Sequence, residues 1–188
     1  FAVWGYGAFL STESPTYREL LRDVEEKHIG SFAIQTQGSP LGIERSQVYP
    51  TAVLVNTLQS HAKVPLLVAA DFERGTSMRV EEGSSFPHAM AVAATGRPED
   101  AYTMGKITAL EARAVGVPWI FAPDADVNSN PANPIINTRS FGEDPARVSE
   151  VAAACYGVYV TALGSGGGVT ICGNRIHDFA DSSGAASN

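Results

Sequence analysis

The apolar run "VPLLVAADFE" at residues 64–73 decides the fold class. Apolar side chains follow one another without alternation, and the run ends with the acids Asp71 and Glu73. This pattern is expected of a parallel strand that is buried on both faces of its sheet. Helices must cover the faces of such a sheet, so the run predicts an α/β protein.

Predicted strands and helices alternate on both sides of this run. Strand-like segments occupy residues 2–9, 31–37, 64–73, 118–124 and 167–174. Helical patterns occupy residues 14–30, 49–63, 97–116 and 145–163. Ser14 is expected to cap the first helix and Gly30 to end it. The alternation implies βαβ units with right-handed crossovers.

The number of units indicates part of a barrel. A complete (β/α)8 TIM barrel typically takes about 250 residues, whereas this chain has 188 residues and five strand candidates. Five units make about half to five-eighths of such a barrel, and an open α/β sheet is the alternative; the family resemblance described below implies the incomplete TIM barrel, of about five βα units with parallel strands. A sheet cut after its fifth strand leaves open edges, so we expect a homodimer or a larger assembly through these edges.

Composition and charge exclude several classes of partner. The net charge of −7 and the lack of a basic cluster argue against a nucleic-acid partner. No apolar run approaches the roughly 20 residues that span a bilayer, so no membrane partner is expected. The N-terminal stretch lacks the basic region and the cleavage site of a signal peptide, and we expect a cytoplasmic protein.

Neither a metal nor another cofactor is expected. The four histidines have no paired spacing that would suggest a metal site. Cys155 and Cys172 fit no zinc pattern, and we interpret both as buried free thiols in a reducing compartment.

Polar side chains gather where two predicted strands end. Asp71 and Glu73 close the run at 64–73, and Asp124 and Asp126 follow the strand that begins at residue 118. Ligands of barrels and of open α/β sheets bind at the carboxyl ends of the strands. These acids therefore mark the predicted functional face.

Three segments carry a more specific signal. They are "PLLVAADFERG" (65–75), "FPHAMAVAATG" (86–96) and the long polar loop "FAPDADVNSNPANPIINTRSFGEDP" (121–145). Together they resemble the N-terminal barrel domain of glycoside hydrolase family 3, and the branch they resemble most is the bacterial β-N-acetylhexosaminidases. The resemblance covers roughly residues 1–163, and Arg74 departs from it by standing where that family usually has glycine.

The resemblance implies a set of sugar-binding residues. Asp71 and Arg79 keep the family's eight-residue separation, and "NTRSFGEDP" places its loop arginine at Arg139. In that family the matching residues bind hydroxyl and N-acetyl or carboxylate groups of the sugar. We predict that a small sugar such as an N-acetylglucosaminide binds weakly to Asp71, Arg79, Asp126 and Arg139.

Each of these residues also has a purely structural interpretation. Asp71 could cap the following turn, and Arg79 could be a solvated loop residue. Arg139 could pair with Asp126 or Glu143 and shape the long loop.

The catalytic groups that the resemblance implies do not follow in the expected place. The family branch carries Lys-His-Phe-Pro-Gly-His-Gly-Asp on the strand after the loop, whereas Cys172 and Gly173 stand near that position here. We interpret residues 164–188 as a divergent strand and polar tail, such as a frameshift or truncation would join to the partial barrel at 1–163. A retaining glycosidase needs a nucleophile and an acid/base, so we predict no glycosidase activity in this chain.

Two other functions remain open from the residues. One is a small-ester hydrolase that uses a serine at the open barrel end, with the candidates Ser129, Ser140, Ser165, His177, Asp178 and Asp181. The other is a non-catalytic carbohydrate-binding or vestigial protein.

Overall fold

The computed structural model describes residues 2–6, 13–35, 37–39 and 42–156, and its architecture is α/β. Four parallel strands form one sheet: β1 (Ala2–Tyr6), β2 (Ser31–Gln35), β5 (Leu67–Ala70) and β6 (Trp119–Ile120). The predicted strand 167–174 and the predicted segment 164–188 lie outside the described residues.

The order of the strands indicates which kind of α/β fold this is. The order β1-β2-β5-β6 follows the sequence, so each new strand is added to the same edge of the sheet. A doubly wound sheet instead reverses its order at a switch point. Winding in one direction is how a (β/α)8 barrel grows, and the described strands therefore form part of such a barrel.

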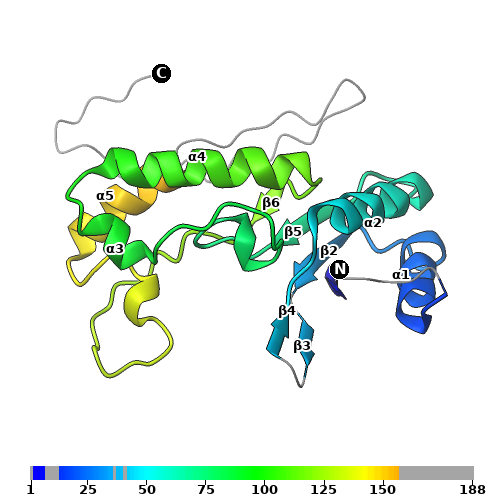
Figure 1. The fold of residues 1–188 in the computed structure, drawn as a ribbon, viewed down its shortest axis with the longest axis horizontal. Helices are drawn as coiled ribbons and strands as arrows, with labels where there is room; N and C mark the ends of the chain where they lie inside the picture. Colours follow the sequence, from blue (N-terminus) through cyan, green and yellow to red (C-terminus); the bar gives the residue numbers. More distant parts are fainter. Residues whose placement is uncertain (1, 7–12, 36, 40–41, 157–188) are drawn as a thin grey trace.

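Helices connect the strands and cover the sheet. They are α1 (Pro15–Glu25), α2 (Val48–His61), α3 (Ala89–Ala93), α4 (Pro98–Ala114) and α5 (Pro145–Tyr156), with the 3-10 turns η1 (Thr76–Met78) and η2 (Asn137–Arg139). Figure 1 shows α1 and α2 at one end of the long axis and α3 and α5 at the other.

The first helix begins as predicted but ends earlier. The Oγ of Ser14 accepts a hydrogen bond from the backbone N–H of Tyr17 at 3.1 Å, which satisfies a donor that the helix itself leaves unpaired. The prediction that Gly30 ends the helix is wrong, because α1 stops at Glu25. His28, with φ of 55°, takes the left-handed conformation instead.

A small antiparallel hairpin was not predicted from the sequence. Strands β3 (Gln37–Ser39) and β4 (Gly42–Glu44) pair separately from the main sheet. The predicted strand at 31–37 ends at Gln35, and this hairpin begins shortly after it. Figure 1 shows the hairpin projecting from the body of the chain.

Two apolar clusters hold the described elements together. The first lies between the sheet and helices α1, α2 and α4, and its most buried side chains include Phe32, Ile34, Leu58, Val68 and Val117. The second lies among α3, α4 and α5 and includes Met104, Phe141, Val148 and Val151. Burial of such side chains supplies most of the stability of a fold of this size.

The prediction of buried free thiols is confirmed for Cys155, and Cys172 lies outside the described residues. Cys155 is a buried free thiol, and burial raises its pKa to about 12. A Cβ on Gly105 of α4 would lie 2.5 Å from the backbone oxygen of Cys155, so glycine lets α4 and α5 approach closely. Trp119, by contrast, is 37% exposed on the edge strand and makes an edge-to-face contact with Phe121.

Candidate functional site

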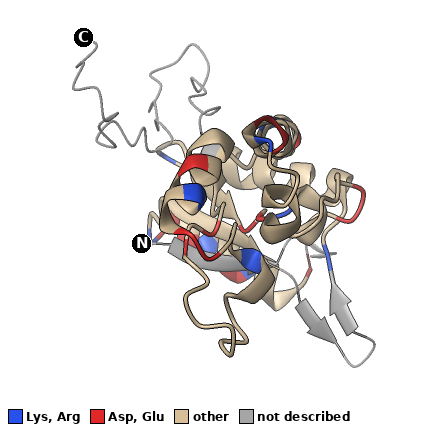
Figure 2. Ribbon diagram, turned by 90° about the vertical axis from the view of Figure 1, so that its left-hand side faces the viewer, with Lys and Arg blue, Asp and Glu red and all other residues tan. Residues whose placement is uncertain are grey.

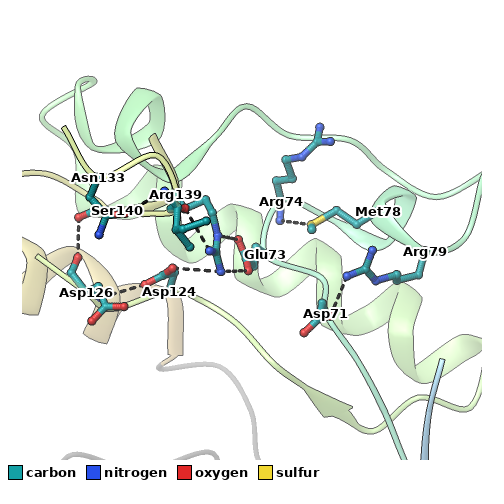
Figure 3. A network of polar contacts seen from close by, with 11 residues as sticks. Asp71, Glu73, Arg74, Met78, Arg79, Asp124, Asp126, Asn133, Arg139 and Ser140 are labelled. Atoms are coloured by element: carbon teal, nitrogen blue, oxygen red, sulfur yellow. Dashed lines mark hydrogen bonds and ion pairs between the residues drawn. The ribbon is translucent and has the colours of Figure 1, made fainter. Parts of the chain in front are cut away.

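The carboxyl ends of β5 and β6 meet at one rim of the sheet. Asp71 directly follows β5, Glu73 lies two residues further on, and Asp124 follows β6. The segment η2 then brings Arg139 of the long loop back to this rim. Figure 3 shows these side chains together with Arg79. The same face was predicted from the sequence.

Asp71 and Arg79 form one ion pair of the rim. The Nη2 of Arg79 lies 2.7 Å from the Oδ2 of Asp71, and the Nε2 of Gln35 donates to the same oxygen at 3.3 Å. The side chains are 29% exposed for Asp71 and 17% exposed for Arg79. The other carboxylate oxygen, Oδ1, has no hydrogen-bond partner among the residues that the structure describes, so it remains able to accept from a ligand.

Arg139 forms a second and larger set of contacts. Its Nε and Nη2 donate to the two oxygens of Glu73 at 2.9 and 2.7 Å, in the bidentate geometry that suits a guanidinium. Its Nη2 also lies 3.2 Å from the Oδ2 of Asp124, whose side chain is only 8% exposed. The hydrogen bonds that Arg139 donates to Glu73 raise the pKa of Arg139, partial burial opposes this, and the charges of Glu73, Asp124 and Asp71 add to the rise.

These contacts correct the structural alternative that the sequence suggested for Arg139. The guanidinium pairs with Glu73 and Asp124, and neither Asp126 nor Glu143 is its partner. Glu73 lies 66 positions earlier in the chain, so the arginine joins two loops, and its Nη1 also donates to the carbonyl of Ile135 in its own loop at 3.2 Å. The reason is that the rim already presents two carboxylates where η2 returns.

Asp126 is the predicted site residue that does not join the others. Its backbone N–H donates to the Oδ1 of Asp124 at 3.0 Å, and its carbonyl accepts from the Oγ of Ser140 at 2.5 Å. Its side chain is exposed, and within the described part of the chain its carboxylate makes no hydrogen bond. Asp126 therefore shapes the start of the long loop through its backbone.

The loop that carries Arg79 is fixed from both sides. On one side, the N–H of Ser46 donates to the carbonyl of Arg79 and the N–H of Glu81 donates to the carbonyl of Ser46, each at 2.7 Å. On the other side, the carboxylate of Glu111 on α4 accepts hydrogen bonds from Thr76 and Ser84. The loop is thus tied both to the chain before α2 and to α4.

Three acids of this region were not among the four sugar-binding residues predicted from the sequence, although Glu73 and Asp124 were placed on the functional face. Glu73 could have been found, because residues two apart in an extended segment point to the same side. Asp124 lies in the same motif as Asp126, and only the path of the loop shows which of the two faces the arginine. Glu111 lies within a helix far along the chain, and no local pattern indicates its contact with the loop.

The described residues do not bring together the nucleophile and base that a serine-dependent ester hydrolase would need. The Oγ of Ser140 is fully buried and donates to backbone carbonyls of Asp126 and Gly142, so it closes a turn. Ser129 is exposed on the long loop. The other candidates, Ser165, His177, Asp178 and Asp181, lie outside the described residues.

Charged side chains of both signs are intermixed over the described residues. Figure 2 shows Lys and Arg positions lying among Asp and Glu positions rather than gathering on one element. Within the described ranges, no group of three or more His, Cys, Asp or Glu side chains is arranged to hold a metal ion. None of the helices in those ranges is long and apolar enough to cross a membrane.

Comparison with known families identifies the chain. The sequence profile of the glycosyl hydrolase family 3 N-terminal domain matches residues 9–165. The chain belongs to glycosyl hydrolase family 3. This result confirms the resemblance seen in the loops around Asp71 and Arg139.

Characterised relatives of this family-3 chain include two bacterial enzymes. It is 42% identical over 136 residues to a β-N-acetylglucosaminidase/β-glucosidase of Cellulomonas fimi, a match that covers 72% of this chain and 22% of the relative. It is 40% identical over 152 residues to a β-hexosaminidase A of Pseudoalteromonas piscicida, covering 78% and 25% of the two chains. The match thus spans about a quarter of each relative's length.

Solved structures agree with this assignment. A family-3 β-N-acetylglucosaminidase from a Paenibacillus species superposes with a TM-score of 0.68 at 29% identity, over 82% of this chain and 28% of that one. A β-N-acetylhexosaminidase of Beutenbergia cavernae gives 0.67 at 27% identity, over 83% and 46%. The chain is therefore β-N-acetylhexosaminidase-like and covers part of the family's N-terminal domain.

Proposed function

We propose that this family-3 chain binds the pyranose ring of an N-acetylglucosaminide at the rim that holds Asp71, Arg79 and Arg139. The observation that carries the proposal is the meeting of both ion pairs at the carboxyl ends of β5 and β6. Relatives named as β-N-acetylglucosaminidase and β-hexosaminidase support the choice of sugar.

The chemistry of the rim suits a polyol. The free Oδ1 of Asp71 can accept from a sugar hydroxyl while Oδ2 stays bound to Arg79. Because Arg79 holds this carboxylate in place, little side-chain entropy is lost when the sugar binds. Bonds from hydroxyls to a charged group are stronger than those to a neutral group.

We further propose that the 188-residue chain does not cleave the glycosidic bond. Cleavage needs an acid/base, and residues 164–188 do not carry the Lys-His-Phe-Pro-Gly-His-Gly-Asp pattern that supplies it in the family branch that the chain resembles. Groups that only position the sugar cannot supply the whole reduction of the barrier.

Titration of the full chain with N-acetylglucosamine, followed by ¹H–¹⁵N NMR, tests the binding proposal. We expect saturable shifts in the wild type and at least tenfold weaker binding in Asp71→Asn, because one hydrogen bond to a charged group contributes about 1.5–3 kcal/mol. Glu150→Gln, which removes a carboxylate from the distant helix α5, is the matched control. Equal affinity in Asp71→Asn and the wild type would refute the assignment of the rim.

Turnover is tested separately with an aryl N-acetylglucosaminide and a short-chain aryl ester. We expect no release of the aryl group from the glycoside. Glycoside turnover that is lost in Asp71→Ala would contradict the proposal, and ester turnover would favour the serine alternative.

We also propose that the chain self-associates. In the described part of the sheet, β6 pairs with β5 on one side only, and a sheet edge of this kind is a template for pairing. Light scattering at micromolar concentration should therefore give a dimer or a larger species. A uniform monomer would overturn this proposal.

A further inference from the structure

We propose that Glu111 is a positioning residue that holds the loop at residues 75–84 so that Arg79 stays aligned on Asp71. The role of this alignment in sugar binding rests on the proposed function. The alignment itself is a property of the folded chain and can be measured without a ligand.

The carboxylate of Glu111 gathers several donors of this one loop. Its Oε2 accepts from the backbone N–H of Ser84 at 2.9 Å and from the hydroxyl of Thr76, and its Oε1 accepts from the hydroxyl of Ser84 at 2.5 Å. Thr76 lies near the start of the loop and Ser84 at its end, so one side chain of α4 clamps both ends of the segment.

The pKa of Glu111 agrees with this role. Partial burial acts to raise it, but the hydrogen bonds from Ser84 and Thr76 outweigh burial and lower the pKa below its ordinary value. The carboxylate therefore stays ionised at neutral pH, and an ionised carboxylate is an acceptor on both oxygens.

Tight backbone packing makes the clamp specific. A Cβ on Gly83 would lie 2.1 Å from the Oγ1 of Thr76 and 2.9 Å from the backbone nitrogen of Ser77. A Cβ on Gly75, whose φ is 102°, would lie 2.1 Å from the carbonyl oxygen of Ser84. The two ends of the loop thus touch directly, and glycine is the residue that permits this contact.

Only one hydrogen bond separates the clamp from the sugar-binding arginine. The carbonyl of Thr76 accepts from the backbone N–H of Arg79 at 3.0 Å and from that of Val80 at 2.8 Å. When the Thr76 side chain is released from Glu111, the 3-10 turn that sets the backbone of Arg79 loses its anchor. The hydrogen bond from the N–H of Ser46 to the carbonyl of Arg79 remains, so Arg79 is expected to lose only part of its alignment on Asp71.

The test compares Glu111→Gln and Glu111→Ala with Glu99→Gln in the full chain. Glu99 lies on the same helix in its first turn and is exposed, so its variant removes the same charge without touching the loop. A carboxamide keeps one acceptor oxygen and cannot satisfy all the donors of Thr76 and Ser84. Ser84→Ala serves as a second route to the same effect should Glu111→Ala fail to fold.

The first readout is the NMR order of the Arg79 Nε–Hε group, assigned by its disappearance in Arg79→Lys. We expect this order parameter to fall in both Glu111 variants relative to the wild type and Glu99→Gln, but to stay above the value of about 0.6 that marks a flexible group, because the bonds to Ser46 and Asp71 remain. The corresponding group of Arg139 should keep its order, because Glu73 and Asp124 hold it independently of the loop.

The second readout is the affinity for N-acetylglucosamine, which should fall about three- to tenfold in Glu111→Gln and stay unchanged in Glu99→Gln. If the wild type binds no sugar, the proposed function fails, while the order of Arg79 still decides this inference. Unchanged order of Arg79 would overturn the inference. Equal loss of order at Arg79 and Arg139 would also overturn it, because it would reveal general loosening of the fold.

Discussion

Replacing Glu73 by glutamine tests whether the contacts of Arg139 stabilise the fold. In the wild type, Arg139 donates two hydrogen bonds to Glu73, at 2.9 and 2.7 Å, and lies 3.2 Å from Asp124. Glutamine keeps the size of the side chain but offers one acceptor oxygen and no charge. The variant therefore removes one charge-assisted bond and weakens the other.

The magnitude follows from the burial of the groups. A hydrogen bond to a charged group contributes about 1.5–3 kcal/mol to stability. The Glu73 side chain is 20% exposed, but Arg139 is 36% exposed and keeps Asp124 as a partner, so screening and the remaining pair reduce the loss. We expect the free energy of unfolding to fall by about 1.5 kcal/mol, towards the lower end of the range.

Urea unfolding at pH 7, followed by tryptophan fluorescence, measures this difference from the shift in midpoint at constant slope. Glu150→Gln is the matched control, since its pair with Arg147 spans one helical turn on the surface and Glu150 is 57% exposed. That variant should lose less than about 0.5 kcal/mol. Equal effects of the two substitutions would show that the contacts of Arg139 add no more than a surface ion pair.

Two further predictions concern the loop at residues 75–84. Gly83→Ala should lower the free energy of unfolding by about 1–3 kcal/mol, because its Cβ would overlap Thr76 and the backbone of Ser77. Gly30→Ala, where a Cβ meets nothing within 4 Å, should change it little in the same urea titration, and similar losses in both would refute the argument. The lowered pKa of Glu111 means that its bonds stabilise the fold above the unfolded value of about 4.3 and that this contribution is lost as the pH falls through the lower folded value. Unfolding measured at pH 7, 5 and 3 should therefore show a smaller acid-induced loss in Glu111→Gln than in the wild type, whereas parallel losses would rule out this role.

Local patterns in the sequence determined the class of the fold and one edge of the site. The apolar run before Asp71 predicted a buried parallel strand, and Ser14 and Pro15 predicted where a helix begins. These signals depend on residues within a few positions of each other. Asp71 was expected at the rim because the carboxyl ends of parallel strands all lie on one side of the sheet.

Tertiary structure alone decided which charges meet and how the loops are held. Glu73 and Arg139 are 66 positions apart and Thr76 and Glu111 are 35 apart, so their contacts depend on how two loops fold back on the sheet and on α4. A carboxylate pairs with whichever donor is brought within about 3 Å, and no spacing in the sequence encodes that distance. For the same reason Asp126, although it follows a strand, turns outwards while Asp124 faces the arginine.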